Sequence, residues 1–162
     1  MRVAAYVRVS TEDQARNGVS LADQQAKVRA YAQLYGHEIV EVIADPGVSA
    51  KNLRRAGVKS LLDMVKQKRI EGIVVAKLDR LTRSVRDLAD ILELCGKRGV
   101  ALMSIGEQID TSTAAGRMIT NMLGVLSQWE RETIGERTSA AIQHKRGNGE
   151  SYSGRQAPYG YA

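Results

Sequence analysis

The stretch Val3-Ala4-Ala5-Tyr6-Val7-Arg8-Val9-Ser10-Thr11 decides the fold. Its valine-rich apolar start has the length of a buried strand and is too short for the core of a helix. Arg8 interrupts this run, and because an unpaired buried charge costs about 3–5 kcal/mol, we expect an anionic group beside its guanidinium. The hydroxyl of Ser10 would then lie next to that anion. Taken alone, the stretch also fits a plainer interpretation, in which Arg8 pairs with a carboxylate and Ser10 caps a helix.

The composition is that of a globular domain of ordinary size. The chain has 162 residues, of which 43% are hydrophobic and 26% charged, enough for one domain with its own core. No apolar run approaches the ~18 residues of a membrane span, and the N-terminus does not begin as a signal peptide. The single cysteine, Cys95, lies among leucines and an isoleucine and is expected in the core. With only two histidines besides, these residue types offer no zinc site.

Positive charge is concentrated in the middle of the chain. The net charge is +6, but residues 51–86 alone hold eleven lysines or arginines against three acidic residues. A local positive field of this kind favours a polyanionic partner, although a solvated helix face would show the same pattern. Aromatic residues make up only 4% of the chain, so a base-stacking platform for single-stranded nucleic acid is disfavoured.

Helix and strand patterns alternate along the chain. After the first stretch, strand patterns recur at 38–44, 72–76 and 100–105. Helices are expected from the capping box at Ser20 to Gly36, over 58–68, and from Ser84 to the glycines at 96 and 99. This alternation predicts an α/β fold, with a doubly wound, mainly parallel sheet of four to five strands and flanking helices.

Polar side chains follow three of the predicted strands. Ligands of such sheets bind at the carboxyl ends of the strands, so these groups converge on one edge. Their convergence favours a functional role for Ser10 over a capping role. The groups are Arg8 and Ser10 after the first strand, Asp45 and Ser49 after the second, and Lys77, Asp79, Arg80 and Arg83 after the third.

A long helix is predicted near the C-terminus. Residues 115–146 contain no proline and would extend about 45 Å, which is more than a domain of this size needs to cover its sheet. A broad apolar band in the first half suits a partner helix, although a helix that wraps its own sheet remains an alternative. The second half is polar and is expected to project. The apolar band includes Met118, Met122, Leu123, Leu126 and Trp129.

The motifs of several enzyme classes are missing from the sequence. It has no Gly-x-x-x-x-Gly-Lys-Ser/Thr phosphate loop and no Gly-x-Ser-x-Gly elbow. What remains is a serine among arginines. A serine that attacks a phosphodiester forms a phosphoserine ester and releases a hydroxyl, while arginines bind the non-bridging oxygens without a metal. The covalent intermediate conserves the energy of the phosphodiester, so strands can be rejoined without ATP.

Three motifs together resemble one family. They are Tyr6-Val7-Arg8-Val9-Ser10-Thr11, the run Lys77-Leu78-Asp79-Arg80-Leu81-Thr82-Arg83, and Trp129-Glu130-Arg131 followed by Glu136-Arg137-Thr138. In order and spacing they are similar to the serine site-specific recombinases, the resolvase/invertase family, from residue 2 to about 146. The resemblance implies site-specific DNA recombination through a 5′-phosphoserine link, with no cofactor and no metal. It also implies a cytoplasmic protein encoded by a bacterium or a phage.

The resemblance implies roles for individual residues. Ser10 is the nucleophile, and Asp79 either protonates the leaving 3′-oxygen or orients the arginines. The matching active-site arginines are Arg8, Arg55, Arg80 and Arg83, and a shift of one residue would put Arg54 in place of Arg55. Supporting positions are Tyr6, Gln14, Gln24, Asp45, Ser49, Arg131, Glu136 and Arg137. Arg54, Lys77, Lys145 and Arg146 are expected to contact DNA.

The family also gives the long helix a role. Its members pair as homodimers through this helix and form a synaptic homotetramer on double-stranded DNA, so we expect the same here. No membrane partner is expected. The ending Pro158-Tyr159-Gly160-Tyr161 resembles the start of the domain that follows the catalytic domain in large serine recombinases. We therefore expect a catalytic domain over residues 1–146, including the helix at about 115–146. Residues 147–162 would be a linker and the start of a C-terminal DNA-binding domain.

Two other functions remain open. A catalytically inactive DNA-binding or assembly module of the same fold would need only the basic residues and the long helix. A flavodoxin-like phosphatase or nucleotide-binding domain would instead turn over a small phosphate ester.

Overall fold

The computed structural model of the chain describes residues 1–9, 20–47 and 55–148. The chain forms two compact units, Met1–Gly124 and Val125–Ala162, and each is described by itself. The first unit holds the sheet and all helices but one, which begins in the first unit and continues into the second. None of the helices in the described ranges is both long enough and apolar enough to cross a membrane.

A single five-stranded sheet forms the middle of the first unit. The strand order is β2-β1-β3-β4-β5, the first four strands are parallel, and β5 runs antiparallel to β4. This confirms the predicted doubly wound, mainly parallel sheet. The strands are β1 (Arg2–Val9), β2 (Glu38–Pro46), β3 (Gly72–Val75), β4 (Ala101–Ser104) and β5 (Ile109–Asp110).

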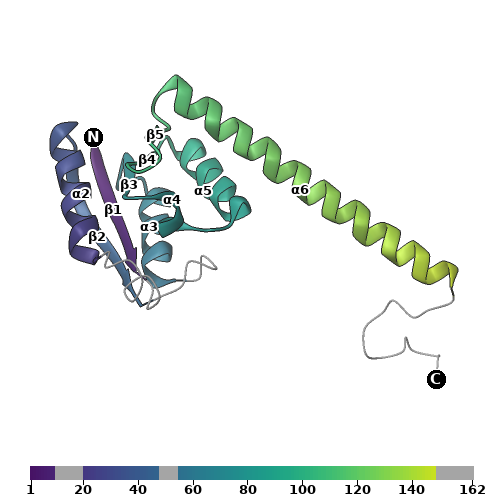
Figure 1. Cartoon of the computed structure of the whole chain (residues 1–162). Coiled ribbons are helices and arrows are strands. Elements are labelled where there is room, and N and C mark those ends of the chain that lie inside the picture. Colours follow the sequence, from purple (N-terminus) through teal and green to yellow (C-terminus); the bar gives the residue numbers. More distant parts are fainter. Residues whose placement is uncertain (10–19, 48–54, 149–162) are drawn as a thin grey trace. The chain divides into compact units, whose positions relative to one another are not determined.

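Helices cover both faces of the sheet (Figure 1). Helix α2 (Leu21–Leu34) lies on one face, and α3 (Ala56–Lys66), α4 (Leu78–Leu81) and α5 (Val85–Arg98) lie on the other. Because side chains alternate along a strand, β1 contributes Val3, Ala5 and Val7 to the apolar cluster under α2 and Ala4 and Tyr6 to the opposite cluster. Burial on both faces explains why the deciding stretch is almost continuously apolar.

The helix ends follow the local signals in the sequence. Ser20 and Asp23 form the expected reciprocal capping box at the start of α2, and the Ser84 hydroxyl accepts from the Asp87 N–H at 3.2 Å before α5. Helix α5 continues through Gly96 and ends at Gly99, whose φ of 70° is in the left-handed region that favours glycine.

Three local features differ from the sequence-based expectation. Strand β2 continues to Pro46, which pairs with Val9, because an edge strand tolerates a residue without an N–H. The segment after β3 is helical over the four residues of α4 and was expected to be a loop. Strand β5 has only two residues, too few for an alternating pattern to reveal.

The long C-terminal helix is present as α6 (Ala114–Gly147). At its start the Thr113 hydroxyl donates to the Asp110 carbonyl oxygen at 2.7 Å and accepts from the Gly116 N–H at 3.0 Å. A Cβ at Gly116 would overlap the backbone carbonyl of Asp110, so the close approach of α6 to β5 requires glycine. Along the same helix, nothing lies within 4 Å of a Cβ at Gly124.

This contrast predicts opposite effects of two identical substitutions. Gly116→Ala should lower the free energy of unfolding by about 2 kcal/mol or more, because backbone must move to relieve the overlap. Gly124→Ala should raise it by about 0.5–1 kcal/mol through helix propensity. Urea denaturation of both variants measures the difference. Equal effects would contradict the packing of α6 on β5.

Candidate active site

The sequence-predicted residues of the first unit gather at the carboxyl edge of the sheet. β1 and β3 are neighbours at the point where the strand order reverses, the position at which ligands of such sheets bind, and β1 extends past the end of β3 to Val9. Ser10 is the next residue along the chain. Four predicted residues lie outside the described ranges, so their placement is not tested: Ser10, Gln14, Ser49 and Arg54.

A buried polar cluster joins β1, β2 and the start of α3. The Tyr6 hydroxyl donates to Asp45 Oδ2 at 2.8 Å and accepts from Arg55 Nη1 at 2.8 Å, while the Asp45 Oδ1 accepts from the Gly57 N–H at 3.0 Å. All three side chains of this Tyr6–Asp45–Arg55 cluster are at most 6% exposed. Burial, followed by the bond to Asp45, raises the pKa of Tyr6 well above its usual value. Tyr6 therefore stays protonated and acts as a neutral hydrogen-bond bridge.

Two buried arginines hold the end of α4. Arg8 Nε donates to the carbonyl oxygen of Arg80 at 3.2 Å, and Arg55 Nη1 donates to the same oxygen at 3.3 Å. Arg55 Nη2 also donates to the carbonyl oxygen of Leu81. The last carbonyls of a helix lack partners within the helix and carry partial negative charge, so guanidinium groups are suitable partners for them. Asp45 lies opposite Arg8 in the register of β1 and β2.

Gln24 fixes the backbone at Arg8. Its Oε1 accepts from the Arg8 N–H at 3.2 Å and its Nε2 donates to the Arg8 carbonyl oxygen at 2.9 Å, and the side chain is 2% exposed. Because β3 is shorter than β1, the C-terminal part of β1 after Tyr6 lacks a strand partner on the β3 side. The amide of Gln24 therefore replaces a strand partner just before Ser10.

The remaining predicted residues of this edge lie on or beside α4. Arg80 is 7% exposed, and its Nε lies 3.4 Å from Asp79 Oδ1. Lys77 precedes α4 and is exposed, and Arg83 is exposed between α4 and α5. The edge thus combines Arg8, Arg55 and Arg80 in buried positions with Asp79, Lys77 and Arg83 at the surface.

Two residues of this edge were not identified from the sequence. Glu107 Oε2 accepts from the Leu78 N–H at 3.2 Å and from the Ser104 hydroxyl, so it caps the start of α4 from the turn after β4. At Gly57 a Cβ would lie 2.7 Å from Asp45 Oδ1, so the carboxylate can cap α3 only over a glycine. The sequence offers no signal for either residue, since Gly57 lies in the first turn of α3 and Glu107 in the turn after β4.

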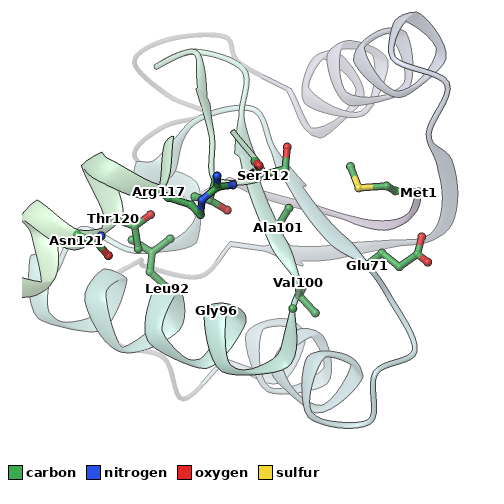
Figure 2. A pocket seen from close by; sticks show the side chains of 12 residues that line it. Met1, Glu71, Leu92, Gly96, Val100, Ala101, Ser112, Arg117, Thr120 and Asn121 are labelled. Carbon is green, nitrogen blue, oxygen red and sulfur yellow. Dashed lines mark hydrogen bonds between the residues drawn. The ribbon is translucent and has the colours of Figure 1, made fainter. Parts of the chain in front are cut away.

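A hollow lies at the amino edge of the sheet, opposite the candidate active site (Figure 2). It has a volume of about 790 Å³, and Figure 2 shows Leu92 from α5 and Arg117 and Thr120 from α6 around it. Met1 and Glu71 lie at the amino ends of β1 and β3. None of the predicted catalytic residues lines this hollow, and it is at the edge away from the strand ends that bind ligands. We therefore place the candidate active site at the carboxyl edge.

Metal ligands are not grouped anywhere in the described ranges. No three His, Cys, Asp or Glu side chains among these residues are close enough together to hold an ion. Cys95 is 2% exposed, as expected for a core residue, and burial raises the pKa of its thiol to about 12.

Comparison with known proteins shows the family of the chain. Residues 3–151 match the family described as Resolvase, N terminal domain. The chain belongs to the resolvase family. It is 37% identical over 154 residues to the DNA-invertase of Escherichia phage P1, covering 95% of this chain and 75% of that protein. It is 33% identical to DNA-invertase hin of Salmonella typhimurium, covering 92% of this chain and 71% of that protein.

Two solved structures have the same fold. The N-terminal catalytic domain of TP901-1 integrase superposes with a TM-score of 0.74 at 33% identity, over 82% of this chain and 98% of that domain. A resolvase family site-specific recombinase from Streptococcus pneumoniae superposes with a TM-score of 0.71 at 28% identity, over 90% of this chain and 99% of that chain.

The predicted residues of the second unit all lie on α6. Four of them are exposed there: Glu136, Arg137, Lys145 and Arg146. The structure does not describe the side chain of Arg131. Because the two units are described separately, the participation of these residues in the site stays a prediction.

The buried cluster gives a direct test of the geometry. Tyr6→Phe removes a donor to Asp45 and an acceptor for Arg55, and should lower the free energy of unfolding by about 1–3 kcal/mol. Tyr35→Phe, at a side chain that is 59% exposed, is the matched control and should change it by less than about 0.5 kcal/mol. Urea denaturation measures both. Similar values for the two variants would contradict a structural role for the Tyr6 hydroxyl.

Proposed function

We propose that this chain is the catalytic domain of a site-specific DNA recombinase that cleaves and rejoins strands through a serine–phosphate ester. Membership of the resolvase family and identity to DNA-invertases support the reaction class. The observation that carries the assignment to this edge is the set of buried arginines, Arg8, Arg55 and Arg80, at the end of the strand that leads into Ser10.

The proposed chemistry is a transesterification. The Oγ of Ser10 attacks the phosphorus of a DNA phosphodiester and loses its proton, and the bond to the 3′-oxygen breaks. A proton is delivered to the 3′-oxygen, which leaves as a hydroxyl, while the phosphate stays joined to Ser10 as a 5′-phosphoserine ester. Rejoining reverses these steps with another 3′-hydroxyl. Because one ester bond replaces another, no ATP is needed. The arginines are proposed to supply the charge stabilisation that a metal ion would otherwise give.

The arginines of the edge would stabilise the charge on the phosphate. Guanidinium groups bind non-bridging oxygens in bidentate fashion, and groups held in a water-poor setting stabilise transition-state charge most effectively. Arg80 and the exposed Arg83 are proposed as phosphate ligands. Arg8 and Arg55 hold α4 in this DNA-free state, and so position Arg80 as well as adding positive potential. Asp79, next to Arg80, is proposed to protonate the 3′-oxygen or to orient the arginine.

The wider protein follows from the same proposal. Residues 1–146 would form the catalytic domain, and 147–162 would lead into a DNA-binding domain. The substrate is double-stranded DNA, and the setting is the cytoplasm of a bacterium, consistent with relatives from bacteria and their phages.

A covalent adduct tests the proposed reaction. The complete recombinase, mixed with a plasmid carrying its target, should give a protein–DNA adduct on a denaturing gel in the presence of EDTA and without ATP. Ser10→Ala should abolish the adduct, whereas Ser60→Ala, at an exposed serine of α3, should leave it unchanged. An adduct that survives Ser10→Ala would refute the assignment. DNA binding without any adduct in the unaltered protein would favour the inactive assembly module.

We also propose that α6 pairs with α6 of a second copy in a homodimer, and that dimers associate as a tetramer on DNA. Four large apolar side chains are exposed on this helix at spacings of four, three and four residues, the spacing of a coiled-coil seam. Each is at least 61% exposed, and two more, Ile119 and Leu126, flank them. The four are Met118, Met122, Val125 and Trp129.

Charge on this seam should prevent pairing. Met122→Lys or Leu126→Glu should shift any dimer toward monomer in sedimentation equilibrium, because an unpaired charge would be buried in the apolar contact. Gln143→Lys, at an exposed polar position of the same helix, should leave the distribution unchanged. A dimer that withstands both seam substitutions would exclude α6 as the contact.

A further inference from the structure

A second hollow adjoins the candidate active site on the α2 side of the sheet. It has a volume of about 510 Å³ and lies within the first unit. It is surrounded by α2, the end of β3, α4 and the turn after β4. Arg80 lines it, which connects it directly with the proposed site. The lining residues are Asp23, Gln24, Lys27, Ala76, Lys77, Arg80, Ile105 and Gly106.

The charge of this hollow is positive. Among the described residues that line it, three carry positive charge, Lys27, Lys77 and Arg80, and one is acidic, Asp23. Asp23 is engaged with the start of α2, where its Oδ2 accepts from the Ser20 N–H at 3.1 Å. In the described part of the chain, neither the Lys27 nor the Lys77 ammonium has an acidic partner within ion-pair distance. Backbone and side-chain hydrogen bonds with Ser20 lower the pKa of Asp23, and the charge of Lys27 helps to lower it without forming an ion pair, so both ammonium groups can still approach an anion.

Close packing and hydrogen bonds hold the walls of the hollow in place. The alkyl chain of Lys77 passes over Gly106, where a Cβ would lie 2.8 Å from Lys77 Cγ. The Gly106 N–H donates to the Ala76 carbonyl oxygen at 2.9 Å, which fixes this turn against the end of β3. On the other side, buried Gln24 is held by the backbone of Arg8. The direction of the Lys77 side chain is therefore set by the fold.

From this geometry we propose that the hollow is a subsite for the DNA backbone, in which Lys27 and Lys77 bind a phosphate next to the one that Ser10 attacks. The inference rests on the proposed function and adds a position to it. Lys77 was expected on DNA from its sequence context, whereas Lys27 had no expected role. A volume of about 510 Å³ exceeds the needs of one phosphate, so a sugar can enter with it. Lysine ammonium groups bind phosphate as point charges and read no bases, so the subsite positions DNA without specifying sequence.

The salt dependence of DNA binding tests the subsite. Each phosphate contact adds about 0.9 to the slope of log Kobs against log salt concentration. Because both lysines bind the same phosphate, the double variant Lys27→Gln/Lys77→Gln should reduce the magnitude of this slope by about 1, and each single variant by part of that amount. Lys68→Gln removes the same charge between α3 and β3, at the amino edge, and should not change the slope. The probe is a 30-base-pair duplex of arbitrary sequence, and binding is followed by fluorescence anisotropy.

A glycine variant separates a built subsite from diffuse charge. Gly106→Ala keeps every charge but displaces the Lys77 chain, and should weaken DNA binding at low salt as Lys77→Gln does. All variants are made with Ser10→Ala, so the measurement does not depend on cleavage, and adduct formation tests the proposed reaction separately. Slopes for Lys27→Gln and Lys77→Gln that equal that of Lys68→Gln would overturn the subsite. A loss for the lysine variants with none for folded Gly106→Ala would assign the effect to diffuse charge and overturn it too.

Discussion

The hydrogen bonds from Arg8 and Arg55 to the end of α4 are the interaction on which this edge of the molecule depends. A helix of four residues cannot stabilise itself, because its few hydrogen bonds do not offset the cost of nucleation. α4 persists because guanidinium groups meet its final carbonyls and Glu107 meets its first N–H. The same bonds also give the two buried guanidinium groups hydrogen-bond partners. Without partners, burying these charges in apolar surroundings would be costly. β1, α3 and the turn after β4 are thereby tied to one another through a single helical turn.

Much of the fold could be predicted from the sequence, since long elements have strong patterns. The apolar run of β1, the caps at Ser20 and Ser84 and the proline-free stretch of α6 each correspond to an element of the structure. The failures are short elements. α4 and β5 have four and two residues, and both depend on contacts with residues far away in the chain. The strand pattern predicted at 38–44 stops two residues short of Pro46, and the position of β2 at the edge of the sheet explains why the strand includes this proline.

For the candidate site, residue types were predictable and partners were not. That Arg8 and Asp45 lie at one edge follows from their place near the ends of parallel strands, whereas Tyr6 and Arg55 were named only through the family resemblance. Which atoms they contact does not, because backbone carbonyls such as that of Arg80 leave no mark in a sequence. Gly57 and Gly106 illustrate the same point, since each is required by one neighbouring side chain that lies elsewhere in the chain. Ser10 and the residues around it remain a prediction from sequence and family.

Arg80 is attached to the structure in two independent ways. Its main chain carries the carbonyl oxygen that holds Arg8 and Arg55, and its side chain lines the positive hollow beside Asp79. A change of side chain at this position leaves the carbonyl where it is. The side chain at position 80, the proposed phosphate ligand, can therefore change without loss of this architecture, whereas the side chains at positions 8 and 55 make the hydrogen bonds to α4 and have no such freedom. Within Arg80, the main chain therefore serves the structure, and the side chain is left for the proposed chemistry.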